Sequence, residues 1–261
     1  MITEEKNKSS ESKLFTKEHF ENFSAHHSWE PGWLVDSRRE SWEQFIHIEE
    51  DNLKNEKWRF SPRSRFVFSN QENLADSTLS PNFKYNLDAP DVICDSVDNI
   101  LLENSDLISP FSEISGPNLG ARQAYQLTNT FFNNGFFIKI PDGFNDNLRI
   151  EIHHNLPNSE EASFQRNFVN LEDFAELTIV ETFSSDQPVS SGLLSNLTHF
   201  KIGKGAKLNR ILIQKLPTKS SFYNLENFDL HADSSVVNVE CYMGASQSRI
   251  ETKGNLLESG S

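Results

Sequence analysis

The sequence predicts a mainly β protein built as a β-solenoid, preceded by a small N-terminal helical region. The main observation is a strand–turn–strand unit that occurs four times between Gly135 and Arg249. Each turn is short and contains Gly, Asp or Ser. These residues suit sharp bends because Gly tolerates positive φ and the Asp and Ser side chains can bond to nearby backbone. The four units are Phe137–Ile152, Phe168–Glu181, Thr198–Ile213 and Asn227–Cys241.

The spacing of these units is the second observation. The last apolar residue before each turn is Ile140, Leu171, Ile202 or Leu230, so the steps are 31, 31 and 28 residues. A repeat of roughly 20 to 50 residues is typical of solenoids, propellers and arrays. A single rung cannot bury its inward face, whereas stacked rungs can. With strand patterning and no helical periodicity in this region, the period favours a β-solenoid.

Apolar and polar residues alternate within the units, as they do in strands that bury one face. Leu148–Ile152 is the clearest case. The chain has 21 Phe residues, and we expect those in the repeats to fill the narrow interior. Those in or beside predicted strands are Phe136, Phe137, Phe168, Phe200, Phe222 and Phe228.

The chain divides into four regions by composition. Residues 1–13 are polar and charged and are expected to form a disordered tail, and residues 14–60 form the N-terminal helical region. Residues 61–117 are expected to be a linker, with little regular structure to about 90, then a short strand at Val92–Cys94 and a helix near Ile100–Leu107. The solenoid region would occupy residues 118–261 and would begin with a helix at about 119–132 that leads into the repeats at Gly135. No cap follows its last strand, so we expect the sequence to be truncated.

Two helices are expected in the N-terminal region. The first covers residues 14–27, and the second begins near Pro31 and ends near Ile46. The apolar side of the second helix would hold Leu34, Trp42, Phe45 and Ile46, with Arg38, Arg39, Glu40 and Glu43 on its polar side.

Charge and composition exclude several classes of partner. The net charge of −14 and the isoelectric point near 5.0 argue against nucleic acid and against an anionic membrane surface. The two cysteines, Cys94 and Cys241, form no CxxC pair and imply no disulfide framework. Neither a signal core nor a run of about 18 apolar residues is present. We therefore expect a cytoplasmic protein with no membrane partner.

Histidine and cysteine residues give few candidate metal sites. His153 and His154 are adjacent on a strand and point to opposite faces, so a polar strand end is the simpler interpretation. A soft site built from His231 and Cys241 is conceivable, but a buried cysteine acting as a small apolar residue is the expected case. The same structural interpretation applies to His199 and Cys94.

Two further patterns in the sequence concern possible binding or catalytic chemistry. Gly203–Ala206 lacks the spacing of a phosphate loop and precedes a strand, so it is expected to be a turn. A polysaccharide-cleaving solenoid would need carboxylates gathered on one face. The second residue after each pre-turn position is Asp142, Asp173, Lys204 or Ala232. This row of carboxylates is broken, so a carbohydrate-active enzyme remains only the alternative hypothesis.

Several segments together resemble the SufB/SufD family of iron–sulfur cluster assembly proteins, and they look more like SufD. The resemblance covers roughly residues 28–60 and 118–257, and it depends on the order of the segments. They are Trp29–Leu34 with Arg38, Arg39 and Trp42-Glu43-x-Phe45; Glu56–Phe60; Phe131–Gly143; Arg166-Asn167; Ala175–Glu181; and Ser248–Glu251.

The resemblance implies a right-handed parallel β-helix and a role as a scaffold subunit without catalysis of its own. SufD-like proteins pair with a SufB-like subunit and a SufC-like ABC ATPase, which docks on a C-terminal helical domain that would follow residue 261. The iron–sulfur cluster belongs to the assembled complex. Within this sequence no catalytic, cofactor-binding or metal-ligating residue is assigned.

Overall fold

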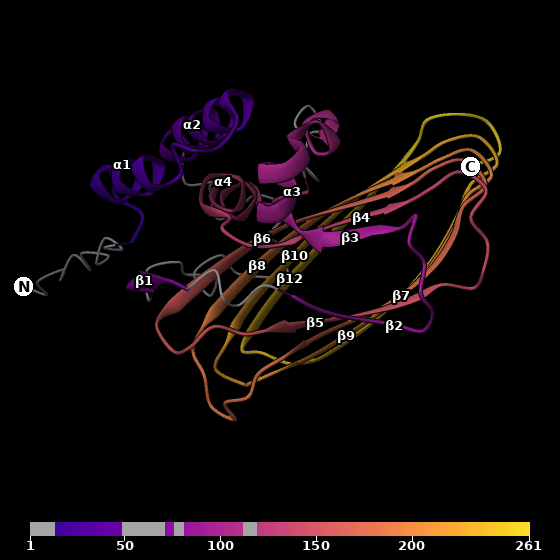
Figure 1. Cartoon of the computed structure of the whole chain (residues 1–261). Helices are drawn as coiled ribbons and strands as arrows, with labels where there is room; N and C mark the ends of the chain where they lie inside the picture. Colours follow the sequence, from indigo (N-terminus) through magenta and orange to yellow (C-terminus); the bar gives the residue numbers. More distant parts are fainter. Residues whose placement is uncertain (1–13, 49–70, 76–80, 112–118) are drawn as a thin grey trace, which may run out of the picture.

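The computed structural model describes residues 14–48, 71–75, 81–111 and 119–261. Two sheets face each other and form a flattened β-solenoid (Figure 1). Sheet A has the strand order β12-β10-β8-β6-β4-β3, with β1 beside β6, and sheet B has the order β11-β9-β7-β5-β2. Strands stacked from rung to rung are parallel, for example β6 with β8 and β7 with β9. The predicted solenoid is confirmed.

The element bounds follow the predicted units closely, although most strands are longer than expected. The helices are α1 (Lys17–His26), α2 (Gly32–Ile46), α3 (Val97–Asn104) and α4 (Arg122–Phe131), with 3₁₀ turns at Ser105–Leu107 and Ser109–Phe111. The strands are β1 (Asn73–Leu74), β2 (Asn82–Tyr85), β3 (Ile93–Ser96), β4 (Phe136–Ile140), β5 (Arg149–Asn155), β6 (Glu161–Leu171), β7 (Glu176–Ser184), β8 (Leu193–Ile202), β9 (Lys207–Leu216), β10 (Ser221–Leu230), β11 (Ser235–Gly244) and β12 (Gln247–Leu256).

The four predicted turns lie above one another at one end of the solenoid. Backbone hydrogen bonds join successive turns, such as Gly203 N–H to Leu171 C=O at 2.8 Å and Gly205 N–H to Ala232 C=O at 2.8 Å. Gly205 has a φ of +65°, and Asp233 adopts a φ of +56° in the next turn. The turn residues were therefore correctly identified, and Gly203–Ala206 is a turn and not a phosphate loop.

The region before the repeats supplies strands to the first rung. β2 pairs antiparallel with β5, and β3 pairs antiparallel with β4. The strand and helix expected near residues 92–107 are present as β3 and α3. The stretch up to about residue 90, expected to have little regular structure, also contributes β1 and β2. The Glu56–Phe60 segment lies outside the described residues.

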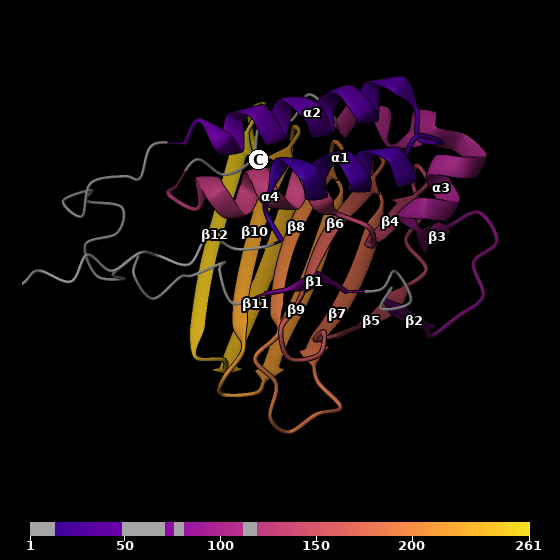
Figure 2. The same cartoon turned by 90° about the vertical axis from the view of Figure 1, so that its left-hand side faces the viewer.

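Helices cover the outer face of sheet A. α1, α2 and α4 lie over β6, β8, β10 and β12, whereas the outer face of sheet B carries no helix of the described chain (Figures 1 and 2). Both predicted N-terminal helices are present. In α2, however, Arg38 is buried and Ile46 is 53% exposed, which reverses two of the expected positions. Arg38 is buried because Glu30 accepts two of its hydrogen bonds, at 2.6 and 2.7 Å.

The core has three parts, and the Phe residues divide among them. Phe137 and Phe168 face outward under the helices, whereas Phe136, Phe200 and Phe228 lie in the solenoid interior near the turns. Phe222 lies in a smaller interior cluster at the other end. All are buried, as expected, but only some of them fill the interior, because the helices give sheet A a second buried face. Within the described part of the chain, no helix is long and apolar enough to cross a membrane.

Candidate functional site

A layer of polar side chains crosses the solenoid interior between its two apolar clusters. The strand alternation places these residues inward, because every second side chain of sheets A and B points into the space between them. Several are completely buried, including a full arginine side chain. We call this group the interior polar layer. Its members are His154, Gln165, Glu181, Asn196, Arg210, Gln214, Asn224, Glu226, Asn238, Glu240 and Tyr242.

Arg210 on β9 is the centre of this layer. Its Nε and Nη2 donate to Glu181 Oε2 at 2.9 and 2.5 Å. Its Nη1 lies 2.7 Å from Glu226 Oε1 and donates to Asn238 Oδ1 at 3.1 Å. The guanidinium carbon also lies 5.3 Å from the centroid of the Phe200 ring. A buried charge is tolerated where its hydrogen bonds are satisfied in this way.

His154 extends the layer towards the first rungs. One ring nitrogen lies 2.8 Å from Glu181 Oε1, and the other lies 2.7 Å from Gln165 Oε1. The ring stacks on Phe183, with the centroids 4.2 Å apart. Glu181 is therefore held from two sides, by Arg210 and by His154. Burial favours a higher pKa for Glu181, but Arg210 and His154 outweigh it and lower the pKa to about 2.

Glu226 has the opposite electrostatic setting. Burial raises its pKa to about 7, since the attraction of Arg210 is offset by the nearby carboxylate of Glu240. Asn224 donates to Glu226 at 2.7 Å, and Tyr242 donates its hydroxyl proton to Glu240 at 2.7 Å. The layer thus holds one carboxylate that stays charged and another that titrates near neutral pH.

A second set of buried polar side chains lies on the outer face of sheet A. Arg166 on β6 and His199 on β8 are 2% and 0% exposed. The Arg166 guanidinium lies 5.1 Å from the Phe168 ring centroid, and the His199 ring lies 6.2 Å from the same ring. Burial, followed by the charges of Arg166 and Lys253, lowers the pKa of His199. This imidazole is therefore neutral.

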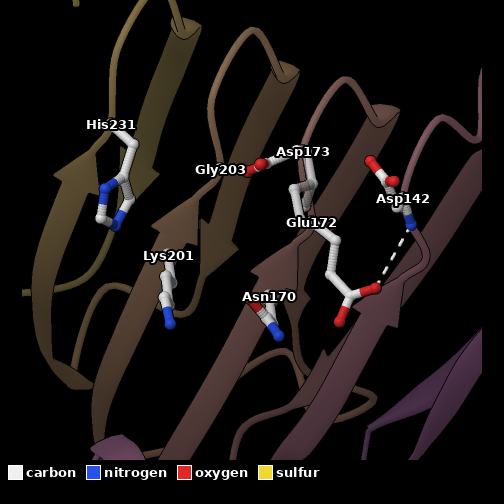
Figure 3. Close-up of a pocket in the computed structure, with 8 residues that line it drawn as sticks. Asp142, Asn170, Glu172, Asp173, Lys201, Gly203 and His231 are labelled. Atoms are coloured by element: carbon white, nitrogen blue, oxygen red, sulfur yellow. Dashed lines mark hydrogen bonds between the residues drawn. The ribbon is translucent and has the colours of Figure 1, made fainter.

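An open groove of about 410 Å³ runs along the turn end of sheet A (Figure 3). Asn170 and Lys201 project into it from neighbouring strands, and His231 lies at the next turn. The Asp142 amide donates to Glu172 at 3.2 Å, and Asp173 accepts from the Lys204 amide at 2.8 Å. These carboxylates stabilise the stacked turns.

The structure separates the members of both candidate pairs, His153 with His154 and His231 with Cys241. His154 is buried, whereas His153 is on the opposite face of β5 and is half-buried. His231 lies 3.3 Å from Glu258 at the turn end, and Cys241 is exposed on the outer face of sheet B. The expectation of a buried Cys241 is wrong, because β11 turns this side chain away from the interior. In the described part of the chain, no three His, Cys, Asp or Glu side chains gather as a metal site.

Cys94 and His199, both expected to be structural residues, differ in how far the structure agrees with that expectation. Cys94 is half-buried beside Tyr85, and burial raises the pKa of its thiol to about 12, so it is an unreactive thiol. His199 is buried as expected, but in the described part of the chain neither of its ring nitrogens has a hydrogen-bond partner. Alternation in the sequence could have placed Arg210 and Glu226 inward. It could not show that they meet each other and Glu181, because these three side chains come from three different strands, β9, β10 and β7.

Comparison with known families identifies part of the solenoid. Residues 154–261 match the family described as "SUF system FeS cluster assembly, SufBD core domain". The matched range begins at His154 and includes every strand from β6 to β12. This match supports a role in iron–sulfur cluster assembly. No curated protein matches the chain.

Proposed function

We propose that this chain is a SufD-like scaffold subunit that takes part in iron–sulfur cluster assembly by binding partner proteins, without catalysis of its own. Its partners would be a SufB-like subunit and a SufC-like ABC ATPase. The observation that carries the proposal is the match of residues 154–261 to the SufBD core domain, over the same strands that form the polar interior. The cluster under assembly is the cargo of the complex.

The geometry of the interior polar layer supports a structural role for these residues. The Arg210 side chain is occupied by Glu181, Glu226 and Asn238. Two sides of His154 are occupied by Glu181 and Gln165. Buried side chains that satisfy one another's hydrogen bonds help to fix the packing of the interior and the register of its strands. The finer assignment to SufD comes from the resemblance of residues 28–60 and 118–257.

The carbohydrate-active alternative is not favoured. Its acid and base would need carboxylates directed at a substrate. At the turn end, Glu172 accepts from the Asp142 amide and pairs with Lys139 at 2.9 Å, and Asp173 accepts from the Lys204 amide. These oxygens are occupied by the turns of the solenoid itself.

Affinity isolation tests the proposal directly. The full-length protein, tagged at its natural expression level, is purified from its own cells, and the associated proteins are identified by mass spectrometry. We expect a SufB-like protein and a SufC-like ATPase in stable stoichiometry, with an unrelated acidic bait as the control. Recovery of neither partner, from cells in which the two are found bound to each other, would contradict the proposal.

Iron and sulfide analysis tests the assembly role. Complexes reconstituted with and without this chain are supplied with iron and a sulfur donor, and the iron and acid-labile sulfide they hold are measured. A scaffold subunit raises the amount of cluster held by the complex. If the complex holds the same amount of cluster with and without this chain, the proposed assembly role is wrong, although the proposed partner binding would still stand.

A further inference from the structure

Arg166 is a buried cation that no carboxylate of the described residues neutralises. Its Nη2 donates to the Phe111 carbonyl oxygen at 3.4 Å, a weak contact, and its Nε has no partner. Among the described residues, no Asp or Glu forms an ion pair with it. Burial lowers its pKa to about 10, so it still carries its charge at neutral pH. Its guanidinium also lies over the rings of Phe132 and Phe168, 5.6 and 5.1 Å from their centroids, and Tyr125 is close enough to act on its pKa.

His199 lies on the same face as Arg166 and is also unsatisfied. It pairs in register with Phe168, two residues along β6 from Arg166. Neither of its ring nitrogens has a hydrogen-bond partner among the described residues, although the side chain is fully buried. Leaving a buried donor or acceptor without a partner costs about 1–3 kcal/mol. Arg166 and His199, diagonal neighbours on β6 and β8, therefore both keep hydrogen-bonding atoms that a further group could use.

Two lysines lie on the same face of sheet A as this pair. Lys253 on β12 lies in the same register row as His199, separated from it by Asn227 on β10. Lys201 follows His199 by two residues on β8, which is about 7 Å along the strand. Lys201 projects into the open groove at the turn end (Figure 3). Neither lysine forms an ion pair with a described carboxylate. Two lysines therefore lie near the buried pair in a chain whose net charge is −14, with Asn227 and Asp229 of β10 between them.

We propose that Arg166 and His199 form the buried end of a binding site for an oxyanion, with Lys201 and Lys253 at its mouth. The ligand would carry at least two oxygen acceptors on one negatively charged group, as a phosphate or a carboxylate does. Arg166 supplies Nε–H and Nη–H donors in the fork geometry that suits such a group. His199 supplies one N–H donor, and the negative charge offsets the buried guanidinium. This inference is independent of the proposed scaffold role.

Thermal unfolding of the full chain with inorganic phosphate or acetate provides the test, with sodium chloride at matched ionic strength to subtract screening. We expect one or both anions to raise the melting temperature in a saturable manner. Phosphate alone would identify a phosphoryl-type ligand, and acetate alone a carboxylate. ¹⁵N NMR of the His199 ring, followed during the same titration, should shift with the same dissociation constant.

Variants separate a specific site from general ion binding. Arg166→Gln and His199→Gln should each weaken the apparent affinity about tenfold or more. Lys253→Gln, at a half-buried position on β12, should weaken it less, and this variant keeps the test valid if Arg166→Gln fails to fold. Lys207→Gln, which removes one exposed positive charge on sheet B, should leave the affinity unchanged. The proposal is overturned if neither anion acts beyond sodium chloride, or if Arg166→Gln, His199→Gln and Lys253→Gln respond as the wild type does.

Discussion

Two buried arginines in this solenoid have opposite surroundings. Arg210 is 1% exposed in the interior, and Arg166 is 2% exposed on the outer face of sheet A. Arg210 contacts Glu181 and Glu226 within 3 Å. Arg166 has two aromatic faces and one distant carbonyl oxygen. The comparison shows that burial alone does not define the role of a charged side chain. The interior arginine is committed to the fold, and the outer one retains donors for another group.

The difference is also one of free energy. Removing one partner of a buried ion pair leaves an uncompensated charge and costs about 3–5 kcal/mol, whereas removing a charge that has no partner also removes its desolvation penalty. Equal substitutions at Arg210 and Arg166 should therefore have unequal effects on the free energy of unfolding.

The largest effect is expected for Arg210→Met. The substitution keeps the apolar stem but leaves Glu181 and Glu226 buried without their cation, so the free energy of unfolding should fall by about 3–5 kcal/mol. Urea unfolding monitored by far-UV circular dichroism measures it. Lys207→Met on the same strand is the matched control, because Lys207 is exposed and its pair with Glu176 is at the surface; it should cost less than about 1 kcal/mol. Similar losses for the two variants would show that the interior pairing is not important for stability.

Glu181→Gln should have the next largest effect, about 2–3 kcal/mol at pH 7, since it weakens the contacts with both Arg210 and His154. The pKa of Glu181 is lowered in the folded state to about 2. The stability it contributes is therefore fully present above the ordinary carboxyl pKa and is lost as the pH falls towards 2. Acid unfolding curves should show a shallower pH dependence below pH 5 for the variant than for the wild type, and superimposable curves would rule out this role for Glu181.

The sequence allowed the solenoid to be predicted because its signals are local. Turn residues, a period near 31 and alternation over five residues at Leu148–Ile152 were enough to place the units. The buried Arg38 and the outward Phe168 were missed, because each depends on which element covers it: Arg38 contacts Glu30 and the Thr130 carbonyl oxygen, and Phe168 faces the helices.

The candidate sites were less predictable for a similar reason. Arg210 meets Glu181 and Glu226, which come from two other strands, and the register that brings them together appears only in the folded stack. The sequence does show Arg166, as part of the Arg166-Asn167 segment. That no described carboxylate pairs with it depends on every neighbouring strand and helix, so no local pattern could reveal it.

Glu226→Gln should have a larger effect on the pH dependence of the free energy of unfolding than on its magnitude. The pKa of Glu226 is raised to about 7 by burial and by Glu240, against the attraction of Arg210. Between the ordinary carboxyl pKa and about 7, the folded state binds a proton that the unfolded state has released, so this group makes stability fall as the pH rises. Glu181 is ionised throughout pH 5–8, and Tyr242 stays neutral because burial raises its pKa. Chemical unfolding at pH 5, 6, 7 and 8 should show a flatter profile for Glu226→Gln, and an unchanged slope would assign the titration to another group.

The smallest effect is expected for Arg166→Met, and it is the most direct test of the comparison. Methionine keeps an apolar chain between Phe132 and Phe168, while the cation–π contacts, about 0.5–2 kcal/mol, are exchanged for relief from burying an unpaired charge. The free energy of unfolding in anion-free buffer should therefore change by less than about 1 kcal/mol. Added phosphate or acetate should stabilise the wild type and not the variant, so the gap between them should widen with anion concentration. A loss as large as that of Arg210→Met in anion-free buffer would mean that Arg166, like Arg210, is committed to the fold.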